Sequence, residues 1–177
     1  MAVLRLEDGR TFVRREVINE IIAPAAVEAV PVPGGLDDLL ARRELSPPEI
    51  AALLDAGADP GLAEECRRVG WPPPLAQVFW PGMPARLEEQ LASFGPPHTN
   101  PAGEIHHVLD GAVIFGVVCT DGSQAIVVVQ PGDALRIYEG VEHWSTLTAD
   151  HRVKTVLYLS RPPGYAHAYT NTRIRVR

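Results

Sequence analysis

The chain reads His98-Thr-Asn-Pro-Ala-Gly-Glu104-Ile-His106-His107-Val-Leu-Asp-Gly111 at residues 98–111 and Pro131-Gly-Asp-Ala-Leu-Arg-Ile-Tyr-Glu-Gly-Val-Glu-His143 at residues 131–143. Four of its six histidines lie within these two segments. Imidazole and carboxylate groups together are typical ligands of a first-row divalent metal that keeps open positions for substrate and oxygen. The two segments therefore predict a metal-dependent site.

Strand geometry groups these side chains further. Successive side chains of a strand point to opposite faces, so Glu104 and His106 share one face and His107 takes the other. His143 comes at the end of a predicted hairpin that begins at residue 133. Two imidazoles and one carboxylate, from His98, Glu104 and His143, are then available to a metal ion.

The sequence around these segments is rich in short apolar runs. Turn signals separate them at close, regular spacing, as in Asp110-Gly111, Asp121-Gly122 and Pro131-Gly-Asp133. Such spacing is typical of an antiparallel barrel or jelly roll. We expect strands at residues 105–109, 112–119, 123–129, 134–137 and 153–159.

The first half of the chain has a different pattern, with helical periodicity between short strands. We expect strands at residues 2–6, 27–32 and 75–80, and helices at residues 13–22, 47–54, 62–69 and 84–91. Ser46 and Glu49 have the spacing of a capping box. The prediction is one mainly β domain, residues 1–177, in which a helical and stranded N-terminal layer (residues 1–91) packs on a β-barrel (residues 92–177).

Composition narrows the partners and the compartment. The 177 residues include 22 acidic and 16 basic ones, for a net charge of −6, which disfavours a nucleic-acid partner. No apolar run reaches the roughly 18 residues that span a bilayer, and the start lacks the layout of a signal peptide. Cys66 and Cys119 fit a reducing compartment. We expect a cytoplasmic protein with no membrane partner, and leave its oligomeric state open.

The two segments match the two motifs of the cupin superfamily, and the likeness extends further. The chain resembles the acireductone dioxygenases over most of its length, at Leu45-Ser-Pro-Pro-Glu49, Val69-Gly-Trp71, Phe94, His98-Thr99, Glu104-Ile105, Val108-Leu-Asp-Gly111, Pro131-Gly-Asp133, His143-Trp144, Pro163-Gly-Tyr165 and Tyr169-Thr170.

The resemblance implies a cupin-type antiparallel β-barrel and a specific chemistry. Members of this family hold Fe or Ni with three histidines and one glutamate, and they cleave the enediol of the methionine salvage pathway with O₂. By resemblance, His98, Glu104 and His143 are metal ligands and Phe94 lines the substrate pocket. We expect a divalent metal cofactor, Fe(II) first and Ni(II) second.

Three departures from the family pattern fall on the predicted site. Asn100 stands where the family has a second histidine, His106 where it has an arginine, and Ser145 where it has an aromatic residue. An amide oxygen binds late first-row metals more weakly than imidazole does, so Asn100 is predicted to hydrogen-bond either a metal ligand or the substrate. Ser145 changes the pocket wall and is predicted to contact the substrate. His106 could be a replacement ligand, an acid/base group beside the substrate, or a structural residue.

The remaining histidines carry less signal. His107 is expected to point out of the barrel or into the helical layer, and His151 lies in a predicted turn. His167 alternates with Tyr165 and Tyr169, which is more typical of core packing than of catalysis.

These observations favour a diverged acireductone-dioxygenase-like enzyme. Its predicted reaction is Fe(II)-dependent cleavage of a C–C bond in a small enediol-type metabolite by O₂. One alternative is a non-oxidative isomerase, lyase or cyclase that acts on a biosynthetic intermediate with His106 as the base. The other is a cupin that has lost its metal through the Asn100 change and only binds a small molecule. The fold alone does not separate these classes.

Overall fold

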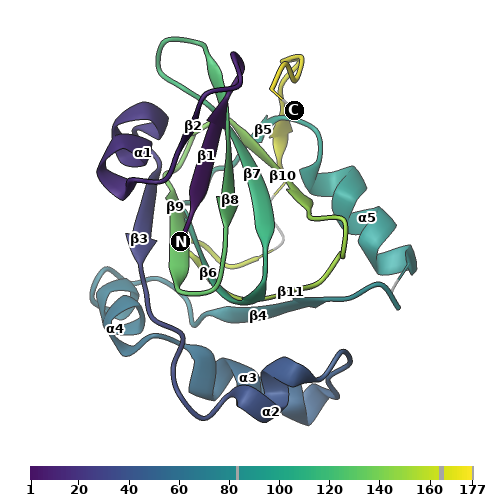
Figure 1. The fold of residues 1–177 in the computed structure, drawn as a ribbon. Coiled ribbons are helices and arrows are strands. Elements are labelled where there is room, and N and C mark those ends of the chain that lie inside the picture. The colour runs from purple at the N-terminus through teal and green to yellow at the C-terminus, as the bar shows by residue number, and fades with distance from the viewer. Residues whose placement is uncertain (83, 164–165, 177) are drawn as a thin grey trace.

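A computed structural model describes residues 1–82, 84–163 and 166–176. Two antiparallel β-sheets face each other (Figure 1). The seven-stranded sheet has the order β12 (Ala168–Tyr169), β5 (His98–Thr99), β10 (His143–Leu147), β7 (Val113–Val118), β8 (Gln124–Val129), β1 (Val3–Leu6) and β2 (Thr11–Phe12). The five-stranded sheet has the order β3 (Ala26–Ala29), β9 (Asp133–Ile137), β6 (Glu104–Gly111), β11 (Val153–Leu159) and β4 (Leu75–Phe79). Among the described residues, the sheets remain two separate hydrogen-bonded units.

The helices of the described chain all lie within residues 15–94. They are α1 (Arg15–Ile22), α2 (Asp37–Ala41), α3 (Pro47–Gly57), α4 (Pro60–Arg68) and α5 (Pro84–Phe94). Figure 1 shows α2 and α3 together on the side of β4 that faces away from the seven-stranded sheet. The structure thus confirms the predicted mainly β fold with a helical N-terminal layer.

Successive side chains of β6 point alternately toward the helical layer and toward the space between the sheets. Ile105 and Leu109 are buried with apolar side chains of the helical layer, among them Leu53 of α3 and Leu62 of α4. His107 shares their face, where its Nε2 lies 3.1 Å from the carbonyl oxygen of Val30. The opposite face of β6 therefore points Glu104 and His106 into the space between the sheets.

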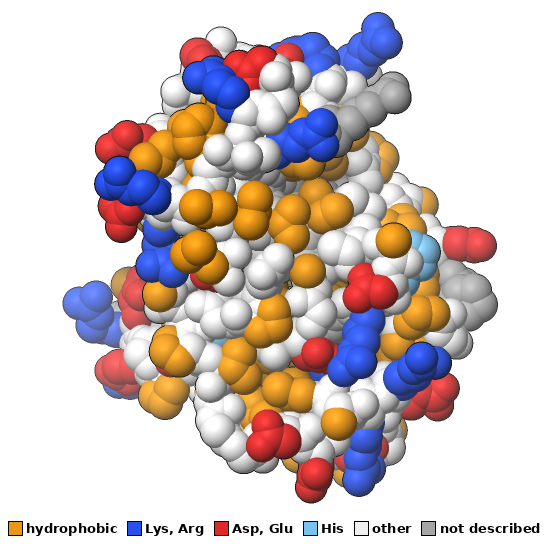
Figure 2. Space-filling model, viewed as in Figure 1, with side chains coloured by type: hydrophobic (Ala, Val, Ile, Leu, Met, Phe, Trp, Pro, Cys, Tyr) orange, Lys and Arg blue, Asp and Glu red, His pale blue; other side chains and the backbone are white. Residues whose placement is uncertain are grey.

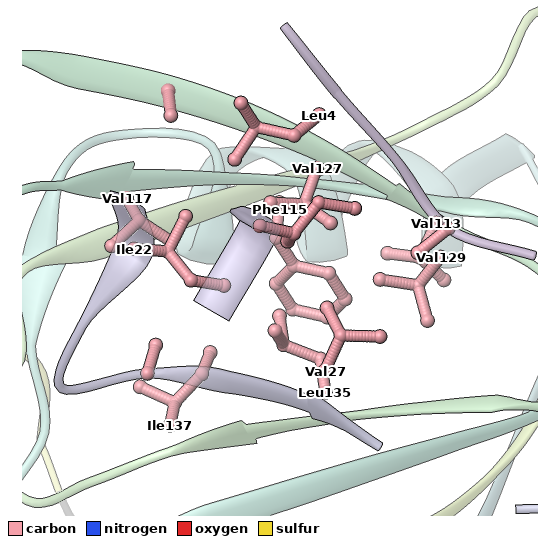
Figure 3. Close-up of a cluster of buried hydrophobic side chains, with 14 of the residues drawn as sticks. Leu4, Ile22, Val27, Val113, Phe115, Val117, Val127, Val129, Leu135 and Ile137 are labelled. Atoms are coloured by element: carbon pink, nitrogen blue, oxygen red, sulfur yellow. The ribbon is translucent and has the colours of Figure 1, made fainter. Parts of the chain in front are cut away.

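The core between the sheets is apolar and comes from both halves of the chain. Figure 3 shows Phe115 of β7 near its centre, with side chains of both sheets around the ring. Leu4 of β1 and Val27 of β3 belong to the same cluster. They reach it because β1 pairs with β8 and β3 pairs with β9, each in antiparallel register. Segments far apart in sequence thus form one continuous core.

Most predicted elements occur within a few residues of their expected bounds. The capping box is confirmed, because the Ser46 hydroxyl and the Glu49 carboxylate each engage the other residue's backbone. The sequence reading missed helix α2 and strand β10. It also missed the two-residue strands β2, β5 and β12, which are too short to carry a hydrophobic period. Gly164 and Tyr165, part of the C-terminal motif of the resemblance, lie outside the described residues.

The only lysine of the chain holds the helical layer to the five-stranded sheet. The Lys154 side chain is nearly fully buried, and its Nζ donates to the carbonyl oxygens of Leu40 at 2.6 Å and Arg42 at 2.7 Å. It also pairs with Asp110 at 3.1 Å. Removal of this ammonium would leave the Arg42 carbonyl without that donor.

We therefore expect Lys154→Met to lower the free energy of unfolding by about 3 kcal/mol, because it breaks a buried charged network on one side. Urea unfolding followed by circular dichroism measures the change. Arg152→Met is the matched control, since Arg152 shares the partners Leu40 and Asp110 but is 35% exposed. The control should cost about 1 kcal/mol or less. Equal losses in both variants would contradict the role assigned to Lys154.

The surface visible in Figure 2 carries acidic and basic side chains intermingled, without a continuous basic patch on that face. Over the described part of the chain, no helix is long and apolar enough to cross a membrane.

Candidate functional site

Three of the predicted site residues lie close together at one end of the space between the sheets. His98 of β5 and His143 of β10 are direct partners in the seven-stranded sheet, and their ring centroids are 4.5 Å apart. Glu104 projects from β6 of the opposite sheet, and its Oε2 lies 4.0 Å from Nε2 of His143. Both sheets therefore contribute donors to the cluster.

Backbone acceptors fix the protonation pattern of the two histidines. Nδ1 of His98 lies 2.8 Å from the carbonyl oxygen of Pro96, and Nδ1 of His143 lies 2.9 Å from that of Val141. A carbonyl oxygen only accepts, so each Nδ1 carries the proton and each Nε2 is the basic nitrogen. Metal-binding histidines characteristically donate their other ring N–H in this way.

Burial acts in the same direction. Desolvation lowers the pKa of His98 and of His143, and for His143 the nearby Glu104 carboxylate opposes the shift. Both imidazoles are therefore favoured in the neutral form that binds a metal ion. Nε2 of His98 is buried and has no hydrogen-bond partner among the described residues.

The Glu104 carboxylate is 5% exposed and accepts hydrogen bonds on both oxygens. Asn100 donates from Nδ2 to Oε1, and Nε2 of His106 lies 2.9 Å from Oε2. A carboxylate only accepts when ionised, so Nε2 of His106 carries the proton and Nδ1 is its basic nitrogen. The charge of Glu104 thus orients two neighbouring side chains.

These donors fit a divalent first-row metal ion. Two neutral imidazoles and one carboxylate are the appropriate donor set, and the unsatisfied Nε2 of His98 is a buried polar atom that an ion would satisfy. Within residues 1–82, 84–163 and 166–176, no three His, Cys, Asp or Glu side chains converge as closely as a bound ion requires. Binding is therefore expected to draw the donors of this cluster together.

A cavity of about 200 Å³ adjoins this cluster, and Glu104 and His106 lie on its wall. Phe94 of α5 and Ser145 of β10 also line it, whereas Asn100, the third predicted substrate contact, is not among the lining residues that the structure describes. The rest of the wall is mainly apolar and comes from both sheets, with Leu75, Phe79, Val113, Phe115, Leu147, Val153, Leu157 and Leu159. The cavity therefore suits a small molecule with an apolar part.

The remaining predicted residues are placed as follows. Asn100 is 3% exposed and lies beside Glu104 rather than at a distance from the cluster. The His106 ring lies 4.7 Å from that of Phe115 on the cavity wall. The structure thus brings all seven predicted site residues into one region; their roles stay predictions.

Sequence reasoning missed one residue of this region, His167. Its ring centroid lies 4.5 Å from that of His98, and its side chain lines the cavity. A weak signal was present in the sequence. His98 and Asn100 are two residues apart, as are His167 and Tyr169, so each pair would lie on one face of a strand. That signal becomes visible only when β5 and β12 are known to pair.

Comparisons with known proteins bear on the family. The ARD/ARD' family profile matches residues 78–167. The acireductone dioxygenase of Rhodopseudomonas palustris CGA009 is 40% identical over 174 residues, covering 96% of this chain and 98% of the relative. That of Microcystis aeruginosa NIES-843 is 30% identical over 177 residues, covering 99% of this chain and 96% of the relative.

The fold has a solved counterpart. A structure described as acireductone dioxygenase from Bacillus anthracis with a cadmium ion in the active centre superimposes with a TM-score of 0.81. It covers 96% of this chain and 98% of its own, at 20% sequence identity. This likeness confirms the predicted cupin-type fold. None of these comparisons supports a non-oxidative or a metal-free function.

The relatives and the family profile indicate the same family. The two relatives match nearly end to end, and the profile covers the segment with the clustered donors. The chain therefore belongs to the acireductone dioxygenase family, and it is a metal-dependent enzyme of the dioxygenase class.

Proposed function

We propose that this enzyme uses Fe(II) and O₂ to cleave a carbon–carbon bond of a small enediol. The observation that carries the proposal is the cluster of His98, Glu104 and His143, in which both imidazoles offer Nε2 and Glu104 lines a mainly apolar cavity. Ni(II) is the second metal that this donor set suits.

His98, Glu104 and His143 would hold the metal ion. Bound there, the ion supplies a Lewis acid for two adjacent oxygens of the substrate and a template for O₂. The protein supplies neutral imidazoles and a buried carboxylate, whose single negative charge offsets part of the charge of a divalent ion.

His106 would accept the proton of the enediol. Its Nε2–H donates to Glu104, so Nδ1 is the nitrogen that takes the hydroxyl proton from the substrate. The carboxylate then stabilises the imidazolium that results. A more electron-rich enediolate reacts more readily with O₂.

The overall reaction balances without a further reductant. An enediol R–C(OH)=CH(OH) and O₂ give two carboxylic acids, RCOOH and HCOOH, with one atom of O₂ in each. The C=C unit is oxidised and O₂ is reduced by the same four electrons. The proton held on His106 returns to the products.

The cavity wall indicates how the substrate is selected. Phe94 and the leucines of the wall suit an apolar substituent R, while Ser145 offers one hydroxyl group for a hydrogen bond. Because the wall is mainly apolar, each additional buried methylene of R should tighten binding by about 0.8 kcal/mol until the cavity is full.

Oxygen labelling tests the proposed reaction. Fe(II)-loaded enzyme is mixed under ¹⁸O₂ with synthetic enediols that differ in R, and products are identified by mass spectrometry. One ¹⁸O atom in each of two acid fragments is the expected result. Consumption of the enediol without O₂ uptake would overturn the proposal and indicate the non-oxidative isomerase, lyase or cyclase.

We expect His106→Gln to lower kcat by about 10²- to 10⁴-fold, because the glutamine amide cannot accept the enediol proton. Metal content should change little, since His106 is not assigned to the metal and the glutamine amide can still donate to Glu104. Steady-state O₂ consumption and metal analysis of the same sample measure both. Loss of the metal in this variant would instead make His106 a ligand.

A further inference from the structure

The pairing of β5 with β12 places one more histidine on the side of the metal cluster. Ala168 pairs with Thr99 and Tyr169 with His98, so antiparallel register sets His167 opposite Asn100. Directly opposed residues share a face, and so do residues two apart in one strand. His98, Asn100 and His167 therefore project toward the same side.

Contacts agree with this placement. The His167 ring centroid lies 4.5 Å from that of His98, which itself lies 4.5 Å from that of His143. Phe94 packs edge-on against His167 at 4.9 Å. Three imidazoles thus follow one another along the cluster, with His98 in the middle.

Hydrogen bonds set the protonation of His167. The Glu104 carboxylate only accepts, so Asn100 turns its Nδ2 group toward Glu104 and its Oδ1 toward His167. Nδ1 of His167 then carries the proton that Oδ1 accepts. Nε2 is the basic nitrogen, as it is in His98 and His143.

We propose that His167 supplies a third imidazole to the metal centre and that Asn100 positions it through Nδ1. This inference rests on the metal site of the proposed function. The three histidines share one pattern, in which an oxygen acceptor holds Nδ1–H and Nε2 is the nitrogen that carries the lone pair a metal ion can take. Asn100, a weak ligand itself, acts through its neighbour, and His106 remains available for proton transfer.

The surroundings of His167 agree with the assignment. Its ring contacts those of Phe94 at 4.9 Å and His98 at 4.5 Å, and its side chain lines the cavity that Glu104 also lines. The segment that carries His167 thereby joins the C-terminal part of the chain to the active site.

The number of coordinated imidazoles can be counted in the Co(II)-loaded protein. Nδ1 protons of histidines bound to Co(II) give strongly shifted ¹H NMR lines that disappear in D₂O. We expect three such lines in the wild type and two in His167→Gln. Chelator competition should show Co(II) binding about 100-fold weaker or more in this variant, since loss of a ligand costs at least as much as loss of a group that supports one.

Three further variants separate ligation from a structural role. His106→Gln, the matched loss of a neighbouring imidazole, should keep three lines. Asn100→Leu should weaken Co(II) binding by about 10- to 100-fold and broaden one line, because the proton on Nδ1 of His167 loses its acceptor. The double variant Asn100→His/His167→Gln should regain the third line, which shows that the fold tolerates the change.

The outcomes are distinguishable. Three lines and unchanged Co(II) affinity in His167→Gln would overturn this inference and leave the metal site of His98, Glu104 and His143 intact. Loss of a line in His106→Gln rather than in His167→Gln would also overturn it. A wild-type protein that binds no Co(II) would overturn the metal site and this inference together.

Discussion

Glu104→Gln is expected to reduce Fe(II) and Co(II) affinity by about 100-fold or more and to abolish O₂ consumption. The substitution removes the only negative charge of the donor cluster and keeps the side-chain volume. It also replaces an acceptor of two hydrogen bonds, from Asn100 and His106, by a group that accepts on one atom only. Mutation of a residue that only hydrogen-bonds a ligand lowers metal affinity by about 10- to 100-fold. Loss of a ligand should therefore lower it further.

The metal-free form should respond differently. Glu104 is 5% exposed, and its burial as a charged group costs free energy that the neutral amide does not incur. We therefore expect the free energy of unfolding of metal-free Glu104→Gln to stay within about 1 kcal/mol of wild type. Chelator competition measures affinity and urea unfolding measures stability on the same samples.

Glu28→Gln is the matched control. Glu28 of β3 is a partly buried carboxylate that pairs with Arg136 at 2.6 Å, outside the cavity wall. Its loss should cost about 1 kcal/mol of stability and leave metal binding unchanged. Full metal occupancy at wild-type affinity in Glu104→Gln would show that this carboxylate is not a ligand.

Gly116→Ala is expected to lower the free energy of unfolding by about 3 kcal/mol, because the added methyl group has no space in a well-packed core and neighbouring atoms must move. Gly116 of β7 lies opposite Trp144 of β10. A Cβ at this glycine would meet the indole ring at 1.9 to 2.4 Å, well inside van der Waals contact. The ring has little room to yield, since Trp144 is itself buried.

The same change should reach the metal centre. Trp144 directly follows His143, so displacement of the indole moves the backbone that carries Nε2 of the ligand. We expect weaker Co(II) binding together with the loss of stability. Urea unfolding and chelator competition measure the two effects.

Two comparisons test this explanation. Gly34→Ala is the control, because a Cβ there meets nothing within 4 Å and the backbone angle is ordinary; it should be nearly neutral. Gly116→Ala combined with Trp144→Leu should cost less than the sum of the two single changes, since the clash is shared. Strict additivity would contradict the assigned contact.

Features that depend on near neighbours could be read from the sequence. The capping box of Ser46 and Glu49 spans three residues, and the structure confirms it. The shared face of Glu104 and His106 follows from the two-residue period of a strand, and both side chains line the cavity. Most helix and strand positions follow from the same local patterns.

Which strands pair could not be read in this way. Strands β5 and β12 have two residues each, too few for a hydrophobic period, and β1 pairs with β8 from the far half of the chain. Such pairings are set by burial across the whole core and by the cost of closing long loops, and not by the residues of either strand alone.

The sequence by itself determined the family resemblance, the mainly β fold and the donors His98, Glu104 and His143 as a predicted metal set. Only the tertiary structure placed His167 opposite Asn100 and gave that amide an acceptor role. The physical reason is the range of each interaction in the sequence. Side-chain alternation and capping act over a few residues, whereas the hydrogen-bonded residues Asn100 and His167 are 67 positions apart.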